Sequence, residues 1–242
     1  MRRSTIIIVG AVAIAAVVLV AYLVGLPGSN GASYNPLINP EDFVEEVDNP
    51  FFPLVPGTAY VYVSYSGIPT STSNERNEVV VTNQTRVVIG VTCTVVWDRV
   101  WQDGSLVEET YDWYAQDEDG NVWYFGEDSK EIEHGIVVST EGSWEAGVDG
   151  ARPGIIMMGH PVVGEEYRQE FYKGEAEDMA RVMALNKTVI THYGTFANCL
   201  QTKEWTPLEH GSAESKYYAP GIGLIIEVDF ETGTEGMELE SW

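Results

Sequence analysis

Residues 112–127 read DWYAQDEDGNVWYFGE, and this stretch decides the fold. Two runs rich in aromatic residues flank a turn that ends in Asp119-Gly120. An Asp-Gly pair between two apolar, strand-favouring runs is a strong local signal for a β-hairpin. Aromatic residues favour strands because they pack well on a pleated, half-buried surface. We therefore predict two antiparallel strands, 106–115 and 121–125, joined by a tight turn.

The same pattern continues on both sides of this hairpin. Short apolar runs are separated by turn-forming residues roughly every 8–12 positions, and the strand–helix alternation of a parallel sheet does not occur. Residues 175–185 fit a helix nearly as well as a strand, and we favour the strand. The fold class is therefore all-β: an antiparallel β-barrel or half-barrel, or a sandwich. Further strands are expected at 58–65, 77–82, 86–89, 92–101, 136–139, 166–172, 189–192, 198–205, 215–218 and 224–228.

The chain is strongly acidic, with 13 Lys+Arg against 37 Asp+Glu and a formal net charge of −24. It lacks the basic surplus that displaces counterions from phosphates, which excludes nucleic acid as a partner. Docking onto anionic lipid surfaces is disfavoured for the same reason. Hydrophobic residues make up 44% of the chain, which is enough to bury a sizeable core.

An uncharged apolar stretch, residues 5–26, follows Arg2 and Arg3. A helix of this length spans the roughly 30 Å hydrocarbon layer of a membrane. The stretch is also longer than the apolar run of about 7–15 residues in a cleaved signal peptide. We predict an N-terminal transmembrane anchor over 1–26, with a long signal peptide as the alternative. Because the two arginines stay in the cytoplasm, both interpretations place the remaining residues outside, on a single-pass protein of the cell membrane.

The exported part divides into three predicted regions. Residues 27–48 are rich in Gly, Ser, Asn and Pro and predict a flexible tether. Residues 49–230 form the predicted extracytoplasmic β domain, and 231–242 an acidic tail. Cys93 and Cys199 lie in strand-like segments of that domain. In an oxidising compartment they are expected to form one disulfide, and two buried free thiols are the alternative.

Aromatic residues gather in the hairpin, and one more, Trp144, lies in the Gly-rich segment 141–158. We expect this segment to fold over a barrel mouth, because long loops in compact domains are usually functional or mobile. Aromatic side chains and one acid could then line a ligand pocket, whereas the alternative is that they are ordinary core residues. The candidate ligand-binding residues are Trp113, Trp123, Tyr124, Trp144 and Glu145.

The hairpin turn itself carries oxygen-bearing side chains at alternate positions, Asp117, Asp119 and Asn121. Ca²⁺ loops place their ligands in this way, so these residues are the candidate metal ligands and Ca²⁺ the candidate cofactor. No bidentate Glu follows at the EF-hand position. An ordinary turn is therefore the alternative.

Four segments resemble a family of exported bacterial and archaeal proteins that has no established activity. They are residues 112–127, GSWEAGVDGARPG at 142–154, AEDMA at 176–180 and KYYAPGIG at 216–223. The last segment is also similar to the final hairpin of half-barrel lipoproteins related to LolA and LolB. This second resemblance implies an open barrel of the LolA or lipocalin type with an apolar concave face and no catalytic residues. The chain departs from those lipoproteins because it has no cysteine for lipid attachment near residues 5–26.

Binding is favoured over catalysis, because the common nucleophile, metal and phosphate-binding motifs are missing. The leading hypothesis is a membrane-tethered β domain that binds a small apolar or sugar-like ligand or a cell-surface partner. One alternative is a hydrolase that uses two carboxylates. A second alternative is a structural component of the cell envelope whose acids are bridged by cations. The candidate acids for the hydrolase are Asp112, Asp117, Glu127, Glu145 and Asp149.

Overall fold

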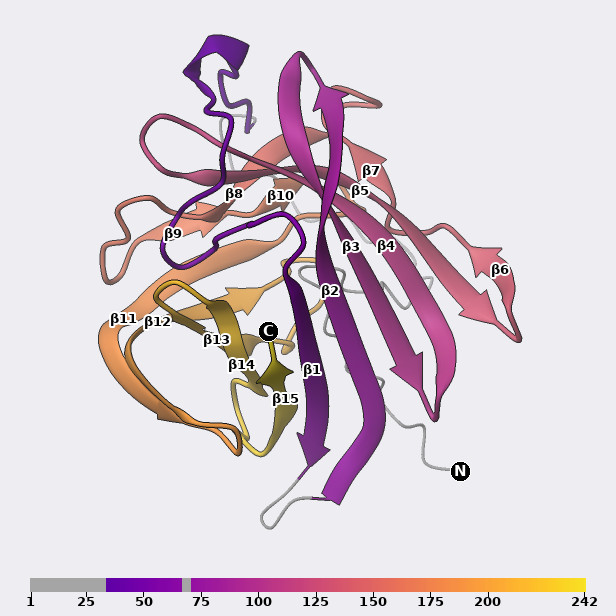
Figure 1. Ribbon diagram of the computed structural model, residues 1–242. Coiled ribbons are helices and arrows are strands. Elements are labelled where there is room, and N and C mark those ends of the chain that lie inside the picture. The colour runs from indigo at the N-terminus through magenta and orange to yellow at the C-terminus, as the bar shows by residue number, and fades with distance from the viewer. Residues whose placement is uncertain (1–33, 67–70) are drawn as a thin grey trace.

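The computed structural model describes residues 34–66 and 71–242 (Figure 1). Within them the chain forms one short 3₁₀ turn, η1 (Pro40–Asp42), and fifteen strands. The strands are β1 (Ala59–Ser66), β2 (Ser71–Val88), β3 (Val91–Gln102), β4 (Ser105–Gln116), β5 (Val122–Glu133), β6 (Ile136–Ser139), β7 (Trp144–Glu145), β8 (Arg152–Met157), β9 (Glu166–Arg168), β10 (Glu170–Phe171), β11 (Met179–Ile190), β12 (Thr195–Trp205), β13 (Glu214–Ala219), β14 (Gly223–Asp229) and β15 (Glu235–Ser241). The prediction of an all-β protein is confirmed, and residues 179–190 are a strand.

The strands build one antiparallel sheet that curls into a nearly closed barrel. Its order is β10-β8-β5-β4-β3-β2-β1-β15-β14-β13-β12-β11-β9, so two meanders meet where β1 pairs with β15. The two ends of this order, β10 and β9, are separated in the sequence by Gln169 alone. Gln169 is buried, and its N–H donates to the Asp178 carbonyl at 2.8 Å. The chain itself therefore holds the two edges of the sheet together.

Alternation along the strands sorts side chains to the inside and outside of the barrel. On β3, Val96, Asp98 and Val100 are buried, whereas Trp97 and Arg99 between them are partly exposed. Outward residues of β3 stack on one another: the Arg99 guanidinium lies 3.7 Å from the Trp97 ring centroid. Arg99 also donates to Glu78 at 2.8 Å. The few cations of this acidic chain thus support aromatic rings on the outer surface.

The segment that was predicted to cover the barrel mouth lies elsewhere. Residues 144–157 supply β7 and β8, which both pair with β5 along its length. The turn between them packs against Ile89 at the β2–β3 turn through Gly147. Gly126 on β5 makes the β7 pairing possible, because a Cβ at this position would overlap the Trp144 carbonyl. The apolar residues of this segment therefore complete the barrel wall.

Gly126→Ala should destabilise the fold by at least about 2 kcal/mol, because the new methyl group meets backbone that cannot rotate away. Urea unfolding of the full chain measures the loss. Gly135→Ala is the control: Gly135 also has positive φ, but a Cβ there meets open space. Equal losses in the two variants would contradict the proposed close packing of β7 on β5.

The predicted acidic tail contains strand β15, which pairs with both β1 and β14. Met237 and Leu239 are each 1% exposed, so this strand is part of the core. Its apolar residues were hidden among alternating glutamates in the sequence. Residues 34–48 of the predicted tether also contact the barrel: Phe43 lies edge-to-face on Phe125, with the ring centroids 5.5 Å apart.

The predicted disulfide is wrong. Cys93 and Cys199 are buried free thiols. Cys93 lies on β3 and Cys199 on β12, and neither strand neighbours the other in the sheet. Burial raises the pKa of the Cys93 thiol to about 12. The cysteines therefore act as small apolar core residues.

In residues 34–66 and 71–242, no helix is long and apolar enough to cross a membrane. The predicted anchor, residues 5–26, lies outside these described residues.

Candidate ligand-binding site

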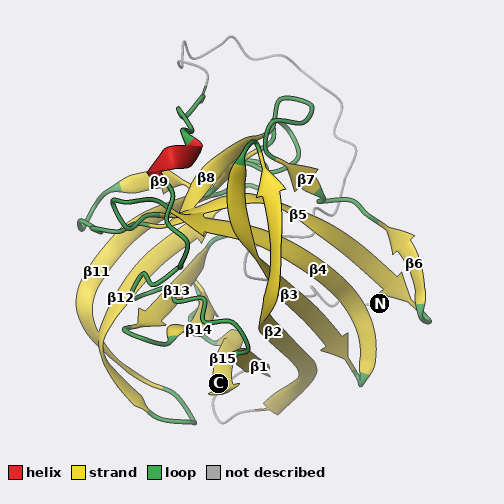
Figure 2. Cartoon of the chain, turned by 45° about the horizontal axis from the view of Figure 1, so that its top comes forward, coloured by secondary structure: helices red, strands yellow, loops and turns green. Residues whose placement is uncertain are grey.

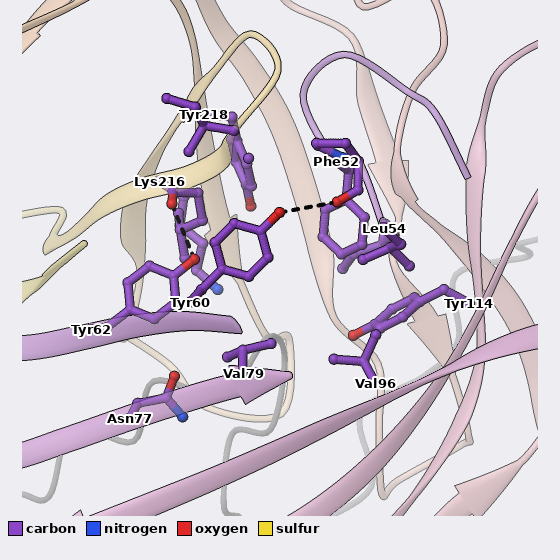
Figure 3. A pocket seen from close by; sticks show the side chains of 15 residues that line it. Phe52, Leu54, Tyr60, Tyr62, Asn77, Val79, Val96, Tyr114, Lys216 and Tyr218 are labelled. Carbon is purple, nitrogen blue, oxygen red and sulfur yellow. Dashed lines mark hydrogen bonds between the residues drawn. The ribbon is translucent and has the colours of Figure 1, made fainter. Parts of the chain in front are cut away.

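The barrel interior contains a cavity of about 60 Å³, enough for a few water molecules (Figure 3). Strands from both meanders form its walls. Residues 47–57, which we name the strap, are a loop that leads into β1 (Figure 2). Phe52, Pro53 and Leu54 of the strap line one side of the cavity. The walls are mainly aromatic and aliphatic. The lining residues are Phe52, Pro53, Leu54, Tyr60, Tyr62, Asn77, Val79, Val96, Tyr114, Ile156, Lys216, Tyr218, Ile222, Gly223 and Leu224.

The strap is fixed firmly at its beginning. The Asn49 side chain is buried and donates to the carbonyls of Gly120 at 2.8 Å and Met158 at 3.1 Å. The Gln116 side chain accepts the Asn49 backbone N–H at 2.8 Å. Gly57 ends the strap with positive φ, and its N–H donates to the Val81 carbonyl. Asn49 and Gly57 are thus two fixed points between which the strap passes over the cavity.

Between these points the strap rests on the barrel through side chains and a few backbone contacts. Phe52 lies edge-to-face on Tyr114, with the ring centroids 5.2 Å apart. The Tyr60 hydroxyl donates to the Pro53 carbonyl at 3.3 Å (Figure 3). The Gly221 N–H donates to the Pro50 carbonyl at 2.7 Å. Phe52 and Leu54 therefore occupy space at the cavity that another apolar group could take.

Next to the cavity the inner face of the barrel becomes acidic. On each strand the next inward position lies two residues away. Next to Val96 on β3 this position is Asp98, and next to Tyr114 on β4 it is Asp112. Six carboxyl side chains from six strands, each at most 6% exposed, continue this change around the interior. We name them the carboxylate belt: Asp98, Asp112, Glu127, Glu170, Glu204 and Glu227.

Hydrogen bonds satisfy part of the carboxylate belt. Asp98 accepts from the Asn77 amide. Asp112 Oδ1 accepts from the Tyr124 hydroxyl at 2.7 Å, and Glu170 Oε2 from Trp144 Nε1 at 3.1 Å. The other carboxylate oxygens of Asp112 and Glu127, Oδ2 and Oε2, accept no hydrogen bond from the described residues.

One buried cation faces the belt from the second meander. Lys216 Nζ lies 3.2 Å from a carboxylate oxygen of Glu204 and 3.2 Å from one of Glu227. Burial is the largest single influence on the Lys216 pKa and lowers it, but Glu204, Glu227 and Glu214 with Tyr218 together outweigh it, so the pKa lies well above its usual value. Lys216 is therefore a charged ammonium that also lines the cavity.

Burial makes the ionised form of these acids unfavourable. Desolvation, with repulsion from Asp98, raises the pKa of Asp112 well above its usual value. Desolvation, with repulsion from Asp112 and Glu170, does the same to the pKa of Glu127. Burial and the neighbouring Glu214 raise the pKa of Glu227 to about 8 despite Lys216. Much of the belt therefore holds protons near neutral pH.

The predicted ligand-binding residues lie around this interior rather than in the cavity. Tyr124 stacks on Tyr114 with the ring centroids 4.8 Å apart and contacts Trp144 edge-to-face. Trp113 points to the opposite side of β4, where the Arg86 guanidinium lies 3.9 Å from its ring centroid. Glu145 pairs with the same arginine, and Trp123 Nε1 donates to Asp117 at 2.7 Å. None of the five lines the cavity described above.

The candidate Ca²⁺ ligands form a hydrogen-bonded turn. The Asp117 carboxylate accepts from the Asn121 backbone at 2.8 Å and from its side-chain amide. The Asn121 side-chain oxygen accepts in turn from the Gly159 N–H. Over residues 34–66 and 71–242, no group of three or more His, Cys, Asp or Glu side chains is arranged to hold a metal ion. The geometry of this turn favours the structural interpretation.

The acids of the hydrolase alternative are dispersed. Asp112 and Glu127 lie opposite each other on β4 and β5 inside the barrel, at 1% and 5% exposure. Asp117 belongs to the hairpin turn, Glu145 pairs with Arg86 and Asp149 lies in an exposed turn. The one close pair is therefore shielded from solvent.

Sequence reasoning missed most residues of the cavity and the belt. Val79, Val96 and Lys216 lie on strands that were predicted correctly, but their inward direction is decided by strand register. A signal was present, since polar residues such as Asn77 and Asp98 interrupt otherwise apolar alternation.

The strand pairing, cavity and belt define an antiparallel β-barrel with a partly polar interior. No protein-family model matches the chain, and no curated protein matches it. Two solved structures are similar to it. One is from Bacteroides fragilis and is named as an exported protein with a YmcC-like fold: identity is 17% over 78% of this chain and 97% of that chain, and the TM-score is 0.43.

The second is from Parabacteroides distasonis and is named as a lipoprotein. Its identity is 12% over 79% of this chain and 97% of that chain, with a TM-score of 0.39. The fold class of this chain is defined by its own strand pairing.

Proposed function

We propose that the protein is a membrane-tethered, extracytoplasmic β-barrel that binds a small ligand with an apolar group in its internal cavity. The single observation that carries this proposal is the apolar cavity beneath the strap. The apolar stretch 5–26 after two arginines supports the tether and the location outside the cytoplasm.

The cavity is too small to accept a ligand unless side chains of the strap move. A cavity of about 150 Å³ is needed for a ring such as benzene, which is more than the 60 Å³ beneath the strap. Ligand entry therefore requires Phe52 and Leu54 to move, while Asn49 and Gly57 hold the ends of the strap. Ligand pockets commonly combine apolar walls with a few polar groups, and Asn77 and Lys216 supply these here.

The test uses benzyl alcohol as a neutral probe and the full-length chain in lipid nanodiscs. Ligand-observed NMR titration should give a Kd of about 1 mM, which corresponds to about −4 kcal/mol. Ile222→Trp fills the cavity and should weaken binding at least about tenfold. Ile226→Trp is the matched control, because Ile226 lies on β14, four residues after Ile222, is partly exposed and does not line the cavity. Equal binding by all three proteins would contradict the proposal, and so would a wild-type protein that does not bind.

A further inference from the structure

We propose that the ligand of this cavity carries a cationic group, an ammonium or a similar nitrogen cation, which binds between Asp112 and Glu127. This inference rests on the proposed function and specifies the chemistry of its ligand: an apolar body joined to a cationic head.

The two acids form a prepared pair of acceptors. Asp112 on β4 and Glu127 on β5 are directly opposite each other in the antiparallel register. Both are buried, and each keeps one carboxylate oxygen that no described residue donates to. A buried acceptor without a donor is costly, so this arrangement is stabilised by any donor that reaches it. An ammonium offers three N–H donors and can bond both oxygens at once.

The pair lies next to the cavity. Asp112 is two residues from Tyr114 on the same face of β4, and it pairs across the strands with Val96. Both Tyr114 and Val96 line the cavity. Inward positions two residues apart are separated by roughly 7 Å. A group that contacts Val96 is thus beside Asp112, which is the cross-strand partner of Val96, and a short linker with the Asp112 side chain covers the remaining distance.

The acidic interior favours a ligand with a cationic head group over one with an anionic head group. The belt has six carboxyl groups, and its buried cation, Lys216, is already engaged by Glu204 and Glu227 on the opposite wall. Burial favours the protonated form of Asp112 and Glu127 in the free protein. A cationic head group stabilises their ionised form, so that its binding releases a proton, whereas an anionic head group opposes ionisation. A bare metal ion is not favoured, because the described residues contain no arrangement of three or more metal-binding side chains. An organic cation suits both the acids and the apolar walls.

The experiment compares three probes of one size: benzylamine, benzyl alcohol and benzoate. Each is titrated into the full-length chain in nanodiscs of neutral lipid at pH 7 and 0.15 M salt, where the field of the whole acidic protein is screened beyond about 8 Å. Benzylamine should bind at least about tenfold more tightly than benzyl alcohol, and benzoate more weakly than both.

Two double variants test whether the tighter binding of benzylamine depends on Asp112 and Glu127. Asp112→Asn/Glu127→Gln keeps the shape of the site but leaves it no carboxyl group that can ionise, so benzylamine should lose its advantage while benzyl alcohol still binds. Glu118→Gln/Asp119→Asn replaces the same two residue types on the exposed hairpin turn and should leave the advantage intact.

Two results would overturn the inference alone: equal binding of benzylamine and benzyl alcohol to the wild type, or an advantage that persists in Asp112→Asn/Glu127→Gln. Failure of all three probes to bind would contradict the proposed function as well.

Discussion

The folded protein should become less stable as the pH rises from about 5 to about 8, which is the reverse of ordinary acid denaturation. Burial and the nearby Glu108 raise the pKa of Glu75 from 4.5 to about 7, and burial raises the pKa of Glu108 by the same amount. The pKa of Asp178 rises to about 7 and that of Glu227 to about 8, again mainly through burial. Asp112, Glu127 and Glu170 have pKa values raised well above the usual range.

The direction follows from proton counting. Between about pH 4.5 and these raised values, the folded protein holds protons that the unfolded chain has released, so stability falls with increasing pH. A buried carboxyl such as Glu108, whose pKa moves from 4.5 to about 7, accounts for a loss on the order of 3 kcal/mol over that interval. Several such groups act together, whereas Lys216 stays charged throughout because its pKa lies well above 10.5.

Urea unfolding of the full-length chain at pH 5, 6, 7 and 8 measures this fall. Glu108→Gln removes one titrating group and should flatten the profile, while Glu118→Gln on the exposed turn should leave it unchanged. Stability that rises from pH 5 to 8 would contradict the account of a protonated interior.

Lys216→Met should cost about 3–5 kcal/mol of stability, because it removes the cation that two buried acids, Glu204 and Glu227, share. Lys216 is 6% exposed and lies within ion-pair distance of both Glu204 and Glu227. Removing one partner of a buried charge group is far more damaging than replacing the whole group. Thermal and urea unfolding at pH 7 measure the loss.

Two variants separate this effect from simple loss of a lysine. Lys216→Met/Glu204→Gln/Glu227→Gln replaces the whole buried group with neutral side chains and should recover most of the lost stability. Lys203→Met removes a partly exposed lysine whose ammonium lies 4.2 Å from the Phe230 ring centroid, and should cost no more than about 1 kcal/mol. Equal losses for Lys216→Met and Lys203→Met would rule out a buried charge group at Lys216.

The sequence was sufficient for the strands with clear local signals. The aromatic hairpin around Asp117–Gly120 identified β4 and β5, and Ile136–Ser139 was placed with its observed bounds. Strand β15 was missed because its apolar residues Met237 and Leu239 are separated by glutamates that look like a solvated tail. Glu238 is itself buried, where it contacts the His192 ring.

The site was harder to predict than the fold. Trp113 and Tyr124 were expected to share a pocket. Tyr124 is instead paired with Tyr114, and Trp113, the neighbour of Tyr114 on β4, faces the opposite side of the sheet. The cavity depends instead on register between β1, β2 and β3 and on the path of the strap, which are long-range properties. Of the carboxylate belt, Asp112 and Glu127 alone were named from the sequence, as candidate acids of the hydrolase alternative. The other four were missed, because a surplus of acids in an acidic chain is normally assigned to solvent.

The central claim is that small ligands bind inside the barrel, and intermolecular NOEs test it most directly. The full-length chain, methyl-labelled at Val, Leu and Ile, is mixed with benzyl alcohol. The account predicts NOEs from the probe ring to the methyl groups of Val79, Val96 and Leu224, which line the cavity. NOEs confined to exposed residues such as Val162 and Val163, with none to these three, would contradict it.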